Sequence, residues 1–563
     1  MARILCPRPP SSPVHLMSIS NSPVEKSLSK SDEDLEGKGS VVHSGNADSG
    51  HMHRSLKGRQ VSMIAVAGTI GTGLFLGSGK ALANGGPVGA LLGYMIVGGL
   101  TGLMMQAPTL SLLGLPLTLR TFATRYVDPA LGFAMGWQFW FQTAIGTPGE
   151  IVAGSILIFF WDDDSKHLAI YITVLLLGII IVNFCGIKYF GEFEFVFASI
   201  KIMTVVGLLL LSLVIDLGGA PDHDRRGFRY WRDAPFNDDF AALKPPFEGS
   251  FSRLLGCPYS SSFLLTMQDA GMETLAMICL EAAKPRVSMR TAVRAIFYRI
   301  VGLYVLSILL IGMCISRSEP ALLQANKEST GTASESPFVV VIISSGIKVL
   351  PHIINAIVLT SAFSAANETL YASSRSLFML AQDGKAPRFF AKVNKRGVPV
   401  YSLALCSFFS LLAYLACGKS GAVDAFNWLS NIIALGSMIT WCGISLSHIR
   451  WYRARKLQGL SRDELPFTSW TQPYGAHIVF VSFLIIIFFN GNSKLKFIPL
   501  FLGFTTFLGS FDAQSFVAAY INIPFMFILF IGYKIVKKTK VVPLATMDCG
   551  THYIEDSVVY SKY

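Results

Sequence analysis

The residues of this 563-residue chain most suited to chemistry include a run of glycine and threonine inside an apolar segment. Gly68-Thr69-Ile70-Gly71-Thr72-Gly73 lies within residues 61–82, long enough to cross a bilayer as a helix of about 20 residues. Glycine costs about 1 kcal/mol against alanine in a helix and permits angles that unwind it. An unwound backbone inside a membrane is tolerated only where protein or a wet cavity surrounds it. The pattern fits a binding site at a broken spanning helix, and it also fits a close helix contact of the Gly-xxx-Gly kind.

Ionisable residues inside other apolar segments form a second group of candidates, because such residues are costly in a membrane and usually face a cavity or a partner. Glu150 follows a Thr-Pro-Gly sequence, and Glu273 lies close to Gly271. Lys201 interrupts a third apolar segment. Burial disfavours the charged form of an amine, so a buried lysine can bind and release a proton during function. The alternative is that Lys201 extends to an interface. Three further glutamates are expected to be interfacial charges within reach of Lys or Arg: Glu192, Glu194 and Glu281.

The composition is that of a membrane protein rather than a soluble domain. Apolar residues make up 52% of the chain and charged residues only 15%. The 41 phenylalanines and 50 glycines fit a polytopic protein, in which close helix contacts need small residues. In a soluble protein, a net charge of +12 would suggest a nucleic-acid partner. In this chain the meaning of the charge depends on where the basic residues lie along the sequence.

Apolar segments recur along the chain and predict an all-α polytopic membrane protein with about 12 transmembrane helices. The first five are expected at residues 61–82, 88–106, 131–160, 168–183 and 193–217. The other seven are expected at residues 262–282, 295–315, 350–380, 401–417, 426–449, 476–489 and 516–536. With alternate loops assigned to alternate sides, one side receives an excess of Lys and Arg, which marks the cytoplasm and places both termini in the cytosol. Because the basic residues are divided among short loops, we expect no nucleic-acid partner.

The ends of the chain differ in composition from the apolar body. We expect residues 1–56 to be a disordered cytosolic N-terminal tail, residues 57–540 the transmembrane domain and residues 541–563 a cytosolic C-terminal tail. The first tail is either simply solvated or a site for regulatory proteins. It shows no signal-peptide pattern. The nine cysteines lack pairing or metal-type spacing, so neither a disulfide framework nor a metal site is expected.

Motifs spread through the apolar body carry a family resemblance. The chain resembles the fungal amino-acid permeases of the yeast amino-acid transporter family, within the amino acid–polyamine–organocation superfamily. The matching motifs are GTIGTGLFLGSG (68–79), GGPVGALLGY (85–94), ATRYVDPALGFAMGW (123–137), FGEFEFVFASIKI (190–202), EAAKPRVSM (281–289), LPHIINAIVLTSAFSAANETLYASSRSLF (350–378) and GLSRDELPF…QPYGA (459–476). They occur in family order and cover about residues 57–540.

The resemblance implies a LeuT-like 5+5 inverted repeat with broken helices 1 and 6 plus two extra helices. It also implies proton-driven symport of an amino acid across the plasma membrane, with no cofactor and no enzymatic activity. The substrate-binding residues would be two segments of broken helix: Gly68, Thr69, Ile70, Gly71, Thr72 and Gly73, then Gly271, Met272 and Glu273. Free amides of the first segment would hold the substrate carboxylate. The proton-coupling residue would be Lys201, and hydroxyls of Ser361 and Ser364 would lie nearby.

The chain departs from the family pattern at residues 107–122 and 252–270, and Asp269 replaces the usual aromatic residue before Gly271. These departures lie near the expected substrate route, so an unusual substrate is one reading and weakened transport another. An amino-acid sensor that binds without transporting is the main alternative function. An enzyme is disfavoured, because the sequence shows no nucleophile–base constellation, metal-ligand cluster or phosphate loop.

Overall fold

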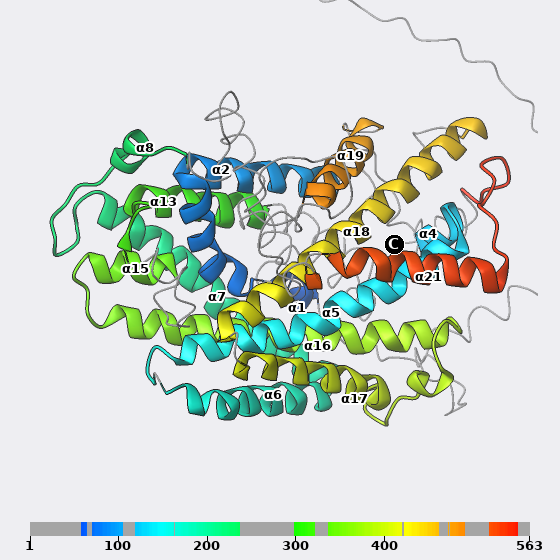
Figure 1. Ribbon diagram of the computed structural model, residues 1–563, viewed down its shortest axis with the longest axis horizontal. Helices are drawn as coiled ribbons and strands as arrows, with labels where there is room; N and C mark the ends of the chain where they lie inside the picture. The colour runs from blue at the N-terminus through cyan, green and yellow to red at the C-terminus, as the bar shows by residue number, and fades with distance from the viewer. Residues whose placement is uncertain are drawn as a thin grey trace, which may run out of the picture. The chain divides into compact units, whose positions relative to one another are not determined.

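The computed structural model describes residues 58–64, 70–104, 119–162, 164–236, 298–320, 336–418, 421–460, 471, 473–489, 517–518 and 520–549. Every regular element in these ranges is a helix, which confirms the all-α expectation (Figure 1). Several sequence-based expectations lie outside the described residues: the tail at 1–56, the span at 262–282, Glu281, and the site candidates Gly68, Thr69, Gly271, Met272 and Glu273.

The long helices fall where the apolar segments predict them. The first half contains α1 (Gly58–Met63), η2 (Gly73–Gly77), α2 (Ser78–Met104), α4 (Leu119–Tyr126), α5 (Pro129–Ile158), η4 (Ser165–His167), α6 (Leu168–Phe184), α7 (Ile187–Asp216) and α8 (Arg229–Asp233). The second half contains η5 (Ile300–Val305), α13 (Leu306–Cys314), α15 (Pro337–Ser344), α16 (Leu350–Gln382), η7 (Arg388–Ala391), α17 (Val400–Phe409), η8 (Ser410–Cys417), α18 (Gly421–Leu457), α19 (Tyr474–Phe489) and α21 (Asn522–Lys537). Within the described ranges, five helical stretches are long and apolar enough to cross a membrane, and shorter apolar helices accompany them.

The first expected span is interrupted. Ile70 and Gly71 are not helical, and the helix resumes at Thr72 as the short π-helix η2 before continuing into α2. A second change of direction occurs at Gly86, whose φ of 73° is one that residues with a side chain rarely adopt. There the amide of Val88 donates to the carbonyl of Pro235 at 3.0 Å, and a β-carbon on Gly86 would stand 2.8 Å from that same oxygen. Gly86 therefore permits the turn that separates the first two spans.

Apolar side chains cover the outside of the helices as well as the inside. On α6, residues three or four positions apart form an exposed stripe on one face, each more than half exposed: Ile170, Val174, Leu177 and Ile181. The opposite face of the same helix is buried. An apolar stripe of this kind would be unfavourable in water and suits contact with lipid. The outward face of α6 therefore supports a membrane location.

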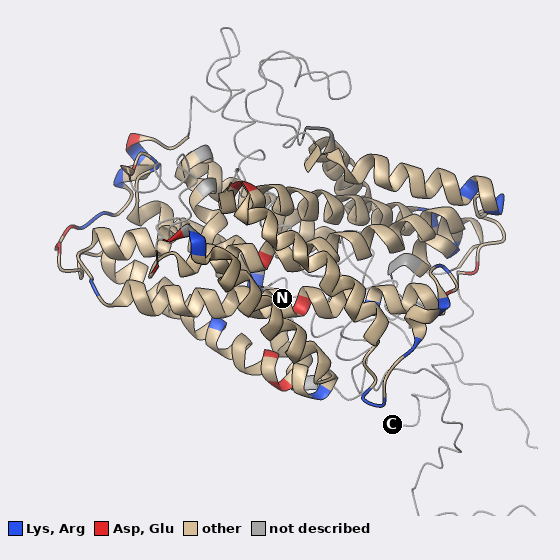
Figure 2. Ribbon diagram, turned by 60° about the horizontal axis from the view of Figure 1, so that its bottom comes forward, with Lys and Arg blue, Asp and Glu red and all other residues tan. Residues whose placement is uncertain are grey.

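The interior of the bundle is built around α5. This helix packs against both α16 and α18, which lie far from it in the sequence (Figure 1). The largest apolar cluster joins η2 and α5 to α16 and α18, and also includes side chains of α6, α7, α13 and α15. Charged side chains of the described residues gather mainly at helix ends and in loops, with few inside the bundle (Figure 2). Those few charges are the ones that need explanation.

Part of the expected C-terminal tail is packed against the helices. The amide of Val542 donates to the carbonyl of Val127 at 2.9 Å, and Gln458, just after α18, donates to the carbonyl of Met547 at 2.7 Å. The side chains of Met547 and Cys549 join an apolar cluster with Trp451. Residues 541–549 are thus held on α18 and on the residues that precede α5.

Candidate functional site

The site is centred on the non-helical residues Ile70 and Gly71, which precede η2. Ile70, Gly71, Thr72 and Gly73 are all buried, so the non-helical backbone at Ile70 and Gly71 is surrounded by protein rather than lipid. The hydroxyl of Ser361 on α16 donates to the carbonyl of Ile70 at 2.9 Å. The carbonyl oxygen of Ile70, which is not part of a helix, thus accepts a hydrogen bond from another helix.

The carboxylate of Glu150 on α5 faces the same interruption. The hydroxyl of Thr72 donates to Oε2 of Glu150 at 3.1 Å. The other carboxylate oxygen, Oε1, lies 2.7 Å from where a β-carbon would stand on Gly71. Only a residue without a side chain allows this approach, so Gly71 sets the distance between the broken backbone and Glu150. The arrangement thus places a carboxylate directly against non-helical backbone inside the bundle.

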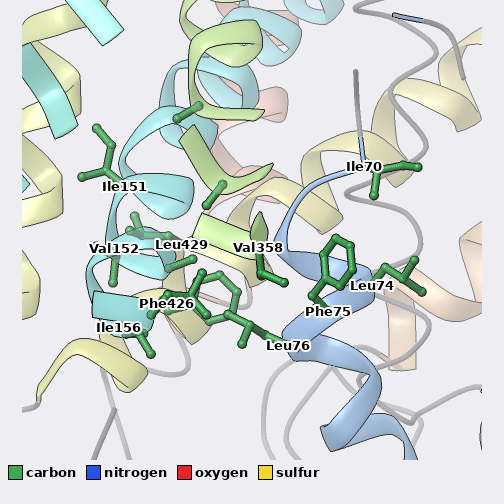
Figure 3. Packing of buried hydrophobic residues seen from close by; sticks show 14 of the residues in the cluster. Ile70, Leu74, Phe75, Leu76, Ile151, Val152, Ile156, Val358, Phe426 and Leu429 are labelled. Atoms are coloured by element: carbon green, nitrogen blue, oxygen red, sulfur yellow. The ribbon is translucent and has the colours of Figure 1, made fainter. Parts of the chain in front are cut away.

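Apolar side chains enclose this polar centre. Figure 3 shows Leu74, Phe75 and Leu76 of η2 on one side, and residues of α5 and α18 facing them. Phe426 of α18 lies between Leu76 and Ile156 in that view. Because such packing excludes water, the few polar contacts near Gly71 are electrostatically stronger than they would be in solution.

A second cluster of polar side chains lies between α7 and α16. Lys201 has no exposed surface, so it does not extend to an interface. Glu194, on the same face of α7, is also fully buried and interacts electrostatically with Lys201. Its carboxylate accepts hydrogen bonds from two side chains of α16, at 2.6 Å from Ser364 and 2.8 Å from Asn367. Two donors and a nearby cation offset part of the cost of burying this carboxylate.

The structure corrects one expectation and agrees with a related one. Glu194 was expected to be an interfacial charge, and this is wrong, because α16 covers its face of α7 and supplies hydrogen-bond donors there. Glu192 lies within reach of a basic residue as expected: it is partly exposed, pairs with Arg59 at 3.3 Å and accepts from Gln60 at 2.9 Å. The two glutamates are only two positions apart, so they point to different faces of the helix.

Sequence reasoning identified some of the groups that meet here and missed others. Glu150 was noticed as an intramembrane acid but not placed in the site. The buried Glu368 was not singled out, although it lies within the motif at 350–378. Both could have been found from the cost of burying a charge in a long apolar segment. Among the described residues no group of three or more His, Cys, Asp or Glu side chains is arranged to hold a metal ion.

An exposed apolar stripe on α6, non-helical backbone buried inside the bundle and buried charges beside it are typical of a membrane transport protein. The chain belongs to the amino acid permease family, whose model matches residues 60–544. It is a permease and not an enzyme.

Named relatives agree with this assignment. The chain is 38% identical over 519 residues to the dicarboxylic amino acid permease of Saccharomyces cerevisiae, covering 91% of this chain and 82% of the relative. It is 35% identical over 505 residues to the general amino-acid permease of the same yeast, covering 88% and 79%. It is also 35% identical over 521 residues to a lysine/arginine permease of Candida albicans, covering 91% and 86%. These relatives bear the names of permeases, which does not favour the sensor alternative.

Proposed function

We propose that this protein carries amino acids together with protons across the plasma membrane, into the cell, by alternating access. The observation that carries the proposal is the buried interruption at Ile70 and Gly71, held by Ser361 and faced by Glu150, with the fully buried Lys201 in a neighbouring polar group. A LeuT-like arrangement of five plus five helices with two additional ones, and cytosolic termini, are part of the same proposal.

The substrate would be held by the two groups that all amino acids share. Free amides around Gly68–Gly73 would bind the α-carboxylate, and backbone carbonyls of the first and sixth spans would meet the α-ammonium. Glu150 supports the ammonium end of this arrangement, because its carboxylate already lies against Gly71. Relatives named for dicarboxylic amino acids and for lysine and arginine support recognition of the shared backbone groups rather than one side chain.

Energy would come from the proton gradient through Lys201. A charged amine at this position would bridge α7 to the broken first span, much as a sodium ion does in sodium-driven relatives. Release of the proton from Lys201 would weaken that bridge and favour the conformation of the transporter that lacks it. A ligand shifts such an equilibrium only by its differential affinity for the two states, so substrate and proton must both bind the occluded state best.

The proposal is tested by uptake of labelled amino acids in cells that lack their own amino-acid permeases. We expect saturable uptake that rises as external pH falls, and that persists when choline replaces sodium. Competition with each of the twenty amino acids identifies the substrate. Lys201→Met should abolish the pH-dependent uptake, whereas Lys188→Met, at an exposed position of the same helix, should not. A sodium requirement, or unchanged uptake by Lys201→Met at every pH, would contradict the coupling scheme.

A further inference from the structure

Glu368 is a buried acid that the proposed function does not yet use. It lies in the middle of α16 and is only 2% exposed. Among the described residues, neither oxygen of its carboxylate has a hydrogen-bond partner. A buried carboxylate without donors is costly as an anion and far less costly as a neutral acid. Its protonation state must therefore depend on the charges around it.

Those charges come from two other elements. Glu368 interacts electrostatically with Glu194 and Lys201 of α7 and with Arg299, the buried N-cap residue of η5. Two carboxylates and two cations thus form one cluster. The two acids differ in a way that matters: Glu194 accepts from Ser364 and Asn367, which favours its charged form, whereas Glu368 has no such donors among the described residues.

Other charged groups on elements packed against α16 have different surroundings. Glu150 of α5 faces Gly71 and Thr72. On α16 itself, the guanidinium of Arg375 lies 3.9 Å from the ring centroid of Tyr371. Arg388 of η7 is exposed. The balance of charge at Glu368 is therefore set mainly by the cluster of Glu194, Lys201 and Arg299.

The position of Glu368 along α16 shows on which side of the broken segment the cluster lies. Ser361, Ser364 and Glu368 are spaced by three and four residues, so they share one face of the helix. Seven residues separate Ser361, which binds Ile70, from Glu368, a rise of about 10 Å along the axis. Glu368 thus lies beyond the broken segment, toward the end of α16 at Gln382. Arg299 precedes η5 and follows Arg290 and Arg294 in the chain, and this basic segment is one of those that the excess of Lys and Arg assigns to the cytoplasmic side.

We propose that Glu368 is a second proton-carrying group, which receives the transported proton from Lys201 and releases it to the cytoplasm. In the transfer an N–H bond of the ammonium breaks and an O–H bond of the carboxylic acid forms. A charged pair becomes a neutral pair, so the net charge of the buried cluster does not change. When the proton leaves, Arg299 offsets the carboxylate that remains. This inference rests on the proposed proton-coupled transport.

The test uses the full-length protein in proteoliposomes. The probes are labelled L-aspartate, L-leucine and L-lysine, one of each charge class, and a trapped pH-sensitive dye reports proton movement. Exchange of labelled for unlabelled amino acid needs no net proton movement, whereas accumulation driven by an imposed pH gradient does. With a gradient of about one unit, one coupled proton supports about tenfold accumulation. The variants are Glu368→Gln, Glu368→Asp and the control Glu192→Gln, at a partly exposed acid outside the cluster.

We expect Glu368→Gln to exchange amino acid but to lose accumulation and proton movement, while Glu192→Gln behaves like the unaltered protein. Accumulation and proton movement by Glu368→Gln with an unaltered pH profile would overturn the inference, and so would loss of exchange in a folded protein. If Glu368→Gln does not fold, Glu368→Asp decides: a shifted pH profile supports the inference, and a superimposable profile overturns it. Failure of the proposed function itself would appear separately, as absence of proton-driven uptake in the unaltered protein.

Discussion

The carboxylate oxygen Oε1 of Glu150 lies 2.7 Å from the position that a β-carbon would occupy on Gly71, although 79 positions separate the two residues in the chain, from 71 to 150. The β-carbon of Ala365 lies 3.2 Å from the same position. Gly71 is therefore enclosed by α5 on one side and by α16 on the other. The absence of a side chain at Gly71 is a condition for bringing these helices to the broken segment.

Gly71→Val should abolish or strongly weaken amino-acid binding. The added methyl groups displace Glu150, and overpacking of a buried site costs about 1–3 kcal/mol, which corresponds to a loss of affinity of about 5- to 150-fold. The measurement is binding of labelled substrate to purified protein. Gly99→Val is the matched control, because a β-carbon on Gly99 of α2 meets no atom within 4 Å. Affinity in Gly71→Val equal to that of Gly99→Val would remove Gly71 from the site.

Ser361→Ala should raise the substrate dissociation constant about fivefold, since a lost hydrogen bond of about 1 kcal/mol leaves the carbonyl of Ile70 without its donor from α16. The neighbouring hydroxyl of Thr360 donates within its own helix, to the carbonyl of Ile357 at 2.7 Å. Thr360→Val therefore removes a hydroxyl without touching the broken segment, and should leave the constant unchanged. Equal effects of the two substitutions on the dissociation constant would show that the hydrogen bond to Ile70 makes no specific contribution to substrate binding.

A pH-dependent contact is expected at the start of α6. Hydrogen bonds from Tyr171 and His167 lower the pKa of Asp162 from 3.8 to about 2, and the bond to Asp162 raises the pKa of His167 above 6.5. The contribution of Asp162 is present above pH 3.8 and is lost as the pH falls through about 2. That of His167 is complete below pH 6.5 and is lost as the pH rises through its raised pKa.

Thermal unfolding of the unaltered protein and of His167→Gln should therefore differ most between about pH 4 and 6.5, and the difference should shrink in alkaline buffer. The difference will be small, because both side chains are partly exposed to solvent. As a control, the effect of His167→Gln is also measured in a protein that already carries Asp162→Asn. If His167→Gln changes the pH dependence of unfolding equally with and without Asp162, the pairing of the two residues is refuted.

Asp128 should stabilise the start of α5 and its contact with α21. Its carboxylate caps α5 by accepting from the amide of Ala130 at 2.8 Å, and it pairs with Lys534 of α21 at 2.7 Å. Burial raises the pKa of Asp128, but hydrogen bonds from Lys534, Ala130 and Thr539 outweigh this, so the pKa lies below 3.8.

Asp128→Ala should lower stability by about 1–2 kcal/mol through loss of the cap, with a further loss from the ion pair. Asp128→Asn keeps a capping oxygen and should cost less. Thermal unfolding in detergent measures both variants. The advantage of the unaltered protein over Asp128→Ala should hold above pH 3.8 and diminish as the pH falls through the lowered pKa. Equal losses in the two variants would assign the effect to charge alone.

Much of the fold could be predicted from the sequence because the signals are local. The lengths of the apolar segments predicted five helices, and most of their ends agree to within a few residues: α5, α6, α7, α16 and α18. The glycine run predicted the interruption at Ile70 and Gly71. The short apolar helix α15 was not predicted. The expectation for Glu194 failed for a different reason: its distance from the helix end suggested an interface, but the helix that covers it comes from elsewhere in the chain.

The sequence alone determined the family, the apolar spans and the weak point in the first of them, because hydrophobic length and backbone preference depend on neighbouring residues. Only the tertiary structure decided which acids meet the broken segment and the buried lysine. Thr72 and Glu150 are 78 positions apart, and Glu194 and Ser364 are 170 apart. Contacts over such distances follow from how α5, α7 and α16 pack against one another, and no local pattern encodes that packing.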